Sequence, residues 1–272
     1  MKKLTYILLL LPMLFISCEE VVDVGLDTAR PRLVIDAYLK WYLGTDGSQQ
    51  MIRLSMTSPY YQEEVPPVSG AVVTVTDNLG NIFNFTEDGA TGIYRCDNFI
   101  PQANGIFYLT VIVDGNTYTA TETMKPVPPI TSVEQRNDGG FMGDDIEVRA
   151  FFIDDGTTDD FYLCRYKPDY NAIPMYEVFE DRFFNGNQMF ALYSDDDLSE
   201  GDQLEIDIFG ISERYYNYMN ILLGVAGSNG GSPFSTPPAT VRGNIVNVTN
   251  PSDYPLGFFA ASQADKHVYT VE

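Results

Sequence analysis

Every second residue is apolar along several short stretches of this chain. Between Leu33 and Lys40, the odd-numbered positions carry Leu, Ile, Ala and Leu, whereas the even-numbered positions carry Val, Asp, Tyr and Lys. Residues 51–56, 71–77 and 107–113 repeat this period of two with many Val and Thr residues. A period of two places successive side chains on opposite faces of a strand. The pattern therefore predicts β-structure with one buried face.

Turn signals separate these predicted strands. Asp88-Gly89, Asn104-Gly105 and Asp114-Gly115 are pairs that tolerate positive φ angles and favour tight hairpins. About seven short strands between residues 31 and 125 predict an antiparallel β-sandwich of immunoglobulin-like type. Within it, residues 70–75, 92–94 and 105–111 resemble the carboxypeptidase-regulatory-like sandwich, which implies a fold and no particular function.

Residues 126–129 contain three prolines and predict a semi-rigid linker. Beyond it, residues 130–272 predict a second, mainly-β domain, because residues 146–153, 161–166 and 204–209 alternate again. One helix is expected near residues 212–224, with Ser212 as its N-cap. Its stripe of Tyr215, Met219, Leu222 and Leu223 predicts packing against a sheet, with a ligand or partner face as the alternative. The fold class is thus all-β with a single helix.

The first 17 residues have the pattern of a secretory signal. Lys2 and Lys3 precede an apolar run from Leu4 to Ile16, which is shorter than the ~20 residues that a membrane-spanning helix needs. The run Phe15-Ile16-Ser17-Cys18 resembles a lipobox, the motif after which bacterial lipoproteins are cleaved and lipidated. We therefore expect residues 1–17 to be removed, Cys18 to carry lipid, and residues 18–30 to form a tether.

The tether has two further features. Glu19, Glu20 and Asp23 resemble the acidic surface-export signal of lipoproteins in Bacteroidota, and solvation of the tether explains them equally. Asp27-Thr28-Ala29 resembles a short O-glycosylation motif of that phylum, which makes Thr28 a candidate acceptor. We expect a protein held on the outer membrane by lipid and facing the cell exterior.

Charge and composition exclude several functional classes. The chain has 16 Lys and Arg against 38 Asp and Glu, and its net charge of −22 argues against nucleic acid as a partner. The chain has one His and three Cys, which are too few for a multi-His zinc site or an iron–sulfur cluster and allow only one His for a Ser-His-Asp triad. We therefore expect no catalytic residues and a protein that is not an enzyme.

Acidic clusters raise the alternative of calcium. They are Asp144-Asp145, Asp154-Asp155 with Asp159-Asp160, and Asp195-Asp196-Asp197 with Glu200. None follows the spacing of an EF-hand loop, and turn chemistry with solvation explains them without a metal, so we expect no metal or cofactor. His267 is expected at the surface or at a strand end. Cys96 and Cys164 are either two buried thiols or a disulfide between the two domains.

The C-terminal third carries a family resemblance. The motifs are, in order, residues 201–206, residues 211–218, Ser232-Pro233-Phe234, Gly243-Asn244-Ile245 and residues 256–262. Together with the lipobox and the sandwich, they resemble the Bacteroidota outer-membrane lipoprotein family labelled domain of unknown function 4249. The resemblance implies a non-enzymatic accessory or ligand-capturing partner of a TonB-dependent transporter in nutrient uptake. A structural or assembly subunit, or a free-standing surface protein for adhesion or glycan binding, is the alternative.

Overall fold

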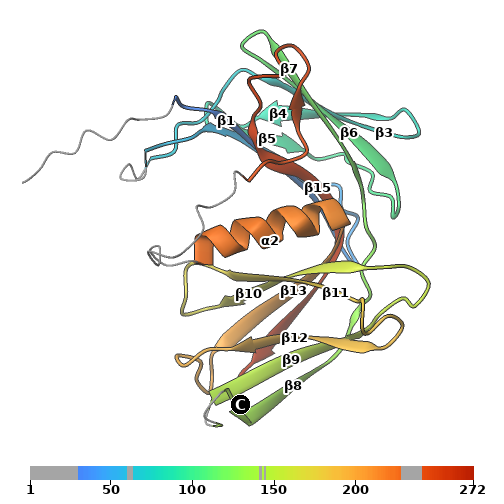
Figure 1. Ribbon diagram of the computed structural model, residues 1–272, viewed down its shortest axis with the longest axis vertical. Coiled ribbons are helices and arrows are strands. Elements are labelled where there is room, and N and C mark those ends of the chain that lie inside the picture. The colour runs from blue at the N-terminus through green and yellow to red at the C-terminus, as the bar shows by residue number, and fades with distance from the viewer. Residues whose placement is uncertain (1–29, 60–63, 141–142, 144, 228–240) are drawn as a thin grey trace, which may run out of the picture. The chain divides into compact units, whose positions relative to one another are not determined.

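β-Strands make up most of the structure, a computed structural model that describes residues 30–59, 64–140, 143, 145–227 and 241–272. One helix, α2 (Glu213–Gly227), lies in these ranges, which confirms the predicted all-β fold with a single helix (Figure 1). The strands are β1 (Leu33–Tyr42), β2 (Gln50–Met56), β3 (Val72–Asp77), β4 (Ile82–Glu87), β5 (Ile93–Cys96), β6 (Ile106–Val113), β7 (Asn116–Thr123), β8 (Ile130–Gly139), β9 (Asp145–Ile153), β10 (Phe161–Pro168), β11 (Met175–Glu180), β12 (Gln188–Ser194), β13 (Gln203–Ile211), β14 (Val246–Asn247) and β15 (Leu256–Thr270).

Strand β15 joins the first and second halves of the chain in one sheet. The order of this 12-stranded sheet, among the described residues, is β11-β10-β13-β15-β1-β2-β5-β4-β3-β6-β7-β14. β15 runs parallel to β1, with Ala37 opposite Phe259, and antiparallel to β13, with Ile208 opposite Asp265. A separate three-stranded sheet has the order β12-β9-β8.

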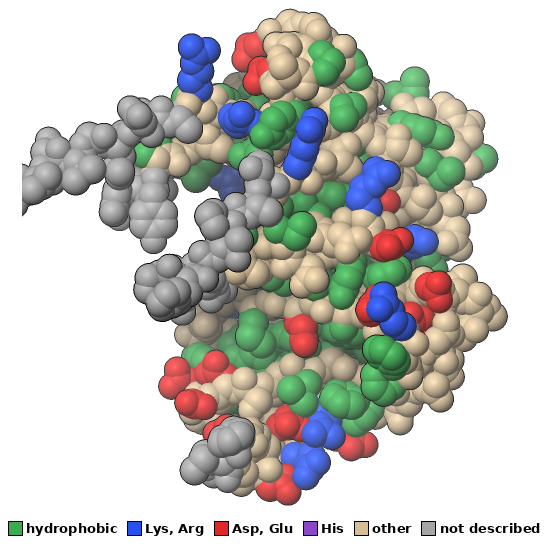
Figure 2. Space-filling view, viewed as in Figure 1, with side chains coloured by type: hydrophobic (Ala, Val, Ile, Leu, Met, Phe, Trp, Pro, Cys, Tyr) green, Lys and Arg blue, Asp and Glu red, His purple; other side chains and the backbone are tan. Residues whose placement is uncertain are grey.

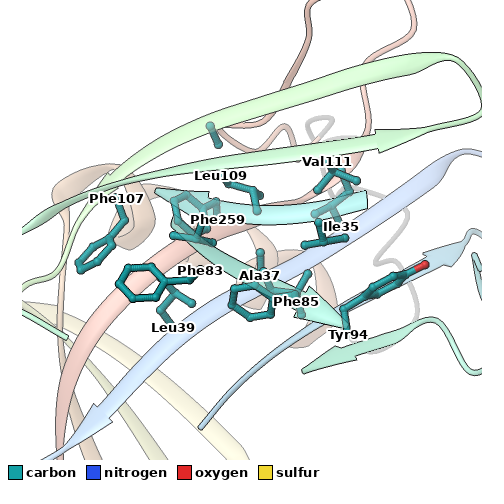
Figure 3. Close-up of a cluster of buried hydrophobic side chains, with 14 of the residues drawn as sticks. Ile35, Ala37, Leu39, Phe83, Phe85, Tyr94, Phe107, Leu109, Val111 and Phe259 are labelled. Atoms are coloured by element: carbon teal, nitrogen blue, oxygen red, sulfur yellow. The ribbon is translucent and has the colours of Figure 1, made fainter. Parts of the chain in front are cut away.

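The first seven strands enclose a hydrophobic core between their inner faces (Figure 3). The inward side chains of β1 are Ile35, Ala37 and Leu39, the apolar set that the sequence alternation singles out, and all three are fully buried. In Figure 3 they point toward Leu109 on β6 and toward Phe259, which β15 contributes from the other end of the chain. The predicted β-sandwich thus includes a C-terminal strand.

Two further clusters of buried side chains lie on opposite faces of strands β10 and β13. On one face, Tyr162, Tyr166 and Ile206 pack against the three-stranded sheet. On the other face, the same strands contribute Leu163 and Phe209, which pack beneath helix α2. Because strand side chains alternate, one pair of strands serves both clusters.

The segment predicted as a linker runs beside β15 and is hydrogen-bonded to it. The backbone N–H of Gln263 donates to Lys125 O at 2.7 Å, and Val127 N–H donates to the side-chain oxygen of Gln263 at 3.3 Å. Residues Pro31–Glu272 form one compact unit. The division into domains 31–125 and 130–272 stays a prediction.

Cys96 and Cys164 are two buried free thiols, so the disulfide alternative is not realised in the structure. Cys96 lies in the sandwich core, whereas Cys164 lies in the cluster under the three-stranded sheet. Burial raises the pKa of both thiols above the ordinary value, which makes each a structural, unreactive side chain.

Candidate functional site

A groove of about 690 Å³ lies where helix α2 faces the central strands. Ligand pockets of proteins have volumes of about 300–1,000 Å³, so this groove has room for a small organic molecule. Its lining comes from β1, β2, β10, β11, β13, β15, the residue before β2 and the helix: Val34, Asp36, Tyr38, Lys40, Tyr42, Gln49, Gln50, Met51, Arg53, Leu163, Arg165, Tyr176, Phe209, Tyr215, Tyr218, Met219, Leu222, Gly257 and Phe258.

The floor of the groove is the outward face of β1. The same alternation that buries Ile35 and Leu39 turns Asp36, Tyr38 and Lys40 to the other side of the strand. An even-numbered face of Asp, Tyr and Lys suits solvent when it is read from the sequence. In the structure, helix α2 partly covers this face and converts it into the floor of a groove.

The wall of the groove is aromatic. Tyr215 and Tyr218 project from α2, and the ring of each lies 4.8 Å from the ring of Phe258 on β15. The Tyr215 ring also meets Tyr38 edge-on at 5.4 Å. Ser212 caps the helix as the sequence predicts, because its hydroxyl oxygen accepts the N–H of Tyr215 at 3.2 Å. The cap fixes the start of the helix and so the position of this wall.

Lys40 is the cation on the groove floor. Its ammonium lies 4.7 Å above the ring of Tyr38 and 5.6 Å from the ring of Phe209, within cation–π range. Burial lowers the pKa of Lys40, while nearby Asp36 opposes that effect. No carboxylate of the described residues lies within 4.0 Å of its ammonium.

Beside Lys40, a network of charges joins β10, β13 and β15. Arg165 Nη1 lies 2.6 Å from Glu205 Oε1 and 2.7 Å from Asp207 Oδ2, and Lys266 Nζ lies 2.6 Å from Glu205 Oε2. Asp207 is fully buried, and neither of its oxygens receives a hydrogen bond of acceptable geometry, so its contact with Arg165 is an ion pair by distance alone. Burial raises the pKa of Asp207 to about 6, although Arg165 and Lys266 act in the opposite direction.

An acidic triad lies away from the groove. Ligand oxygens of Asp154, Asp160 and Asp181 all lie within 4.8 Å of one another. Asp154 accepts hydrogen bonds from Tyr162 Oη at 2.5 Å and from Gly186 N at 2.8 Å, and Asp181 accepts one from Asp160 N at 3.0 Å. These bonds engage both oxygens of Asp154 and one oxygen of Asp181. Burial raises the pKa of Asp160 and of Asp181, which favours protonation within the triad.

The sequence-predicted site residues fall in different places. Cys18 and Thr28 lie outside the described residues. His267 lies exposed on β15, opposite Ile206. Of the predicted acidic clusters, Asp154 and Asp160 come together, and the structure adds Asp181 from a loop that the sequence did not associate with them.

The sequence does not predict the groove, although it contains two of its parts. These are the even-numbered Asp, Tyr and Lys residues of β1 and the aromatic stripe of the helix, which predicts packing against a sheet. In the structure Tyr215 and Met219 do pack against the sheet, and they also line the groove, so packing and a ligand face are compatible. Only tertiary structure brings the two segments together.

Charges of both signs are mixed on one face of the molecule (Figure 2). On the face shown in Figure 2, acidic and basic side chains form small groups of both signs, and hydrophobic side chains lie exposed between them. No described helix is long and apolar enough to span a lipid bilayer.

Comparisons with known proteins add a family and distant structural likenesses. The family model described as "Domain of unknown function (DUF4249)" matches residues 19–267. None of the curated proteins matches the chain.

Three solved structures are similar over more than half of this chain. A two-domain fibronectin type-III segment of chicken tenascin has 10% identity and a TM-score of 0.22, covering 60% of this chain and 85% of its own. A DUF4785 family protein of Legionella pneumophila has 9% identity and a TM-score of 0.28, covering 65% and 52%. A cytokine receptor complex has 10% identity and a TM-score of 0.24, covering 65% and 82%.

Proposed function

The chain belongs to the DUF4249 family, and from this premise we propose that it is a non-enzymatic lipoprotein that captures a small ligand at the outer-membrane surface for a TonB-dependent transporter. The observation that carries the proposal is the groove beneath α2. The groove is concave, its wall is aromatic, and polar groups converge on its floor. These three features are typical of small-molecule sites.

The place of action rests on the N-terminus. The apolar run that ends in Ser17-Cys18 supports lipidation at Cys18, and an anchor of more than one acyl chain holds a protein stably on a membrane. Tethering confines the protein to the membrane surface and raises its effective concentration toward a neighbouring barrel. A modest interface with a transporter then suffices for hand-over of ligand.

The experiment is a pull-down of the tagged full-length protein from outer membranes dissolved in mild detergent. We expect a TonB-dependent barrel to co-purify with the wild-type chain and with the groove variant Tyr218→Ala, because the groove holds ligand and not the barrel. A Cys18→Ala variant should leave the membrane fraction and lose the barrel. Recovery of the wild type alone contradicts the partnership and favours a free-standing surface protein.

A second candidate, a permanent structural or assembly subunit, is supported by one sheet face. The outer face of β3, β6 and β14 exposes large apolar side chains, among them Val72, Ile112 and Val246, and Val72 lies directly opposite Ile112. Exposed apolar surface of this kind marks interaction sites. A barrel complex that survives harsh detergent and contains no small ligand would favour this second function.

A further inference from the structure

The sign of the charge inside the groove is opposite to that of the protein. The chain has 38 acidic residues and only 16 Lys and Arg, yet the charged residues that line the groove are Lys40, Arg53, Arg165 and the single acid Asp36. Three cations with one acid reverse the ratio of the whole chain. A cavity lined by one sign of charge concentrates ligands of the opposite sign.

Two of these cations are not neutralised at short range. Arg165 is engaged by Glu205 and Asp207, but Lys40 and Arg53 have no carboxylate within 4.0 Å among the described residues. Arg53 lies opposite Asp36 in the β1–β2 pairing, at the exposed rim. Lys40 lies deeper, half-buried over two aromatic rings. Asp36 and Asp207 act on Lys40 from beyond 4.0 Å, so its half-buried ammonium has no carboxylate in direct contact, and a ligand anion can take that place.

Tyrosine hydroxyl groups accompany the ammonium. Tyr42, Tyr176 and Tyr215 line the same groove, and their hydroxyls have no hydrogen-bond partner within the part of the chain that the structure describes. The stacked rings of Tyr215 and Tyr218, inclined by 14°, offer a flat apolar surface beside these donors.

We propose that the groove binds an organic anion, with its negative group on Lys40 and its planar, apolar body against the wall of Tyr215, Tyr218 and Phe258. The inference rests on the proposed capture of a small ligand and names its chemical class. A carboxylate or a sulfonate on an aromatic body satisfies the ammonium, accepts hydrogen bonds from the tyrosine hydroxyls and buries its rings.

The test compares two fluorescent probes that share their rings and differ in charge. Anilinonaphthalene sulfonate is an aromatic anion, and N-phenyl-naphthylamine is its neutral counterpart. We expect the full chain to bind the anion at one saturable site and more tightly than the neutral probe. Added salt should lower the affinity for the anionic probe and leave the affinity for the neutral probe unchanged, because salt screens the charge interaction.

Variants assign the site. Lys40→Met keeps the length of the side chain and should lower affinity for the anionic probe about tenfold, since one charge-assisted contact is worth at least that factor. Its affinity for the neutral probe should not change. Lys40→Arg keeps the positive charge and should bind the anionic probe as the wild type does. Lys125→Met, outside the groove lining, is the matched control and should bind both probes as the wild type does. Tyr218→Ala should lower the affinity for both probes.

The outcomes separate the two proposals. Equal affinity for both probes, or anion binding that Lys40→Met leaves unchanged, overturns the anion assignment while ligand capture stands. Failure of both probes to bind, in a chain shown to be folded by circular dichroism, contradicts ligand capture at this groove as well.

Discussion

Asp207 shows how position decides the chemistry of a residue. The sequence offers 38 acidic side chains, and nothing in its spacing separates Asp207 from the others. The structure buries it fully between Arg165 and Lys266, beside Glu205 and within range of Lys40. Burial outweighs the cations and raises the pKa of Asp207 to about 6. This carboxylate, paired with the groove residue Arg165, is therefore a pH-sensitive group beside the groove.

The raised pKa predicts a pH dependence of stability with a definite sign. An unfolded Asp titrates near ~3.9, so above pH 6 the folded state carries the full cost of ionising Asp207, and below about pH 4 it carries none. The Asp207→Asn variant has no such cost. The free energy of unfolding of the wild type minus that of Asp207→Asn should fall by up to about 3 kcal/mol between pH 4 and pH 7.

Urea unfolding of both proteins at several pH values measures this difference. Contributions from all other titrating groups cancel, to the extent that both chains share them. A difference that rises with pH would show that Arg165 and Lys266 lower the pKa of Asp207, contrary to our account.

The elements themselves were largely predictable, because local patterns specify them. The alternation in β1 and the capping signal at Ser212 predict a strand and a helix, and the structure has β1 at Leu33–Tyr42 and α2 at Glu213–Gly227. What the patterns do not contain is the partner of each face. β1 and α2 are far apart in the sequence, and the polar face of β1 is indistinguishable from a solvated one until the helix lies over it.

Loss of the helix cap should weaken α2. Ser212→Ala removes the oxygen that accepts the N–H of Tyr215 and also the hydroxyl that donates to Glu122 Oε2 at 3.1 Å. We expect a loss of about 1–2 kcal/mol in the free energy of unfolding. Ser132→Ala, at an exposed serine on β8, is the control and should change little. Equal stability of both variants would mean that the cap does not hold the helix.

Two glycines should respond to alanine in opposite directions. A Cβ at Gly210 would lie 1.8 Å from Pro126 O, so Gly210→Ala must displace the 125–129 segment from β13, at a cost of roughly 1–3 kcal/mol. A Cβ at Gly224 in α2 meets nothing within 4 Å, so Gly224→Ala should stabilise by about 0.5–1 kcal/mol. Thermal unfolding of each variant measures the change in stability. Tolerance of Gly210→Ala would mean that the segment is not packed there.

At the scale of the whole molecule, β15 makes the two halves depend on each other. It contributes Phe259 and Ala261 to the sandwich core, and Phe258 and Ala264 to the cluster beneath α2. The sequence predicts that His267 lies at the surface or at a strand end, but no local pattern indicates that a strand near the C-terminus pairs with β1. Long-range pairing of this kind is decided by the register of side chains in three dimensions.

A fragment of residues 31–125 tests the predicted domain division. We expect it to show a β-type circular dichroism spectrum and to be less stable than the full chain by at least about 3 kcal/mol. The reason is that it lacks Phe259, which is fully buried in its core. Phe259→Ala in the full chain provides a matched comparison. A fragment that unfolds at the same urea concentration as the full chain would show an independent first domain.

Native mass spectrometry of the full-length protein, purified from its own cells in mild detergent, tests the central claim of ligand capture most directly. Our account predicts one bound small molecule per chain, carrying a negative charge, which is retained by Lys125→Met and present at lower occupancy in Tyr218→Ala and Lys40→Met. A wild-type chain that carries no small molecule, under conditions in which a known lipoprotein complex stays intact, would contradict it.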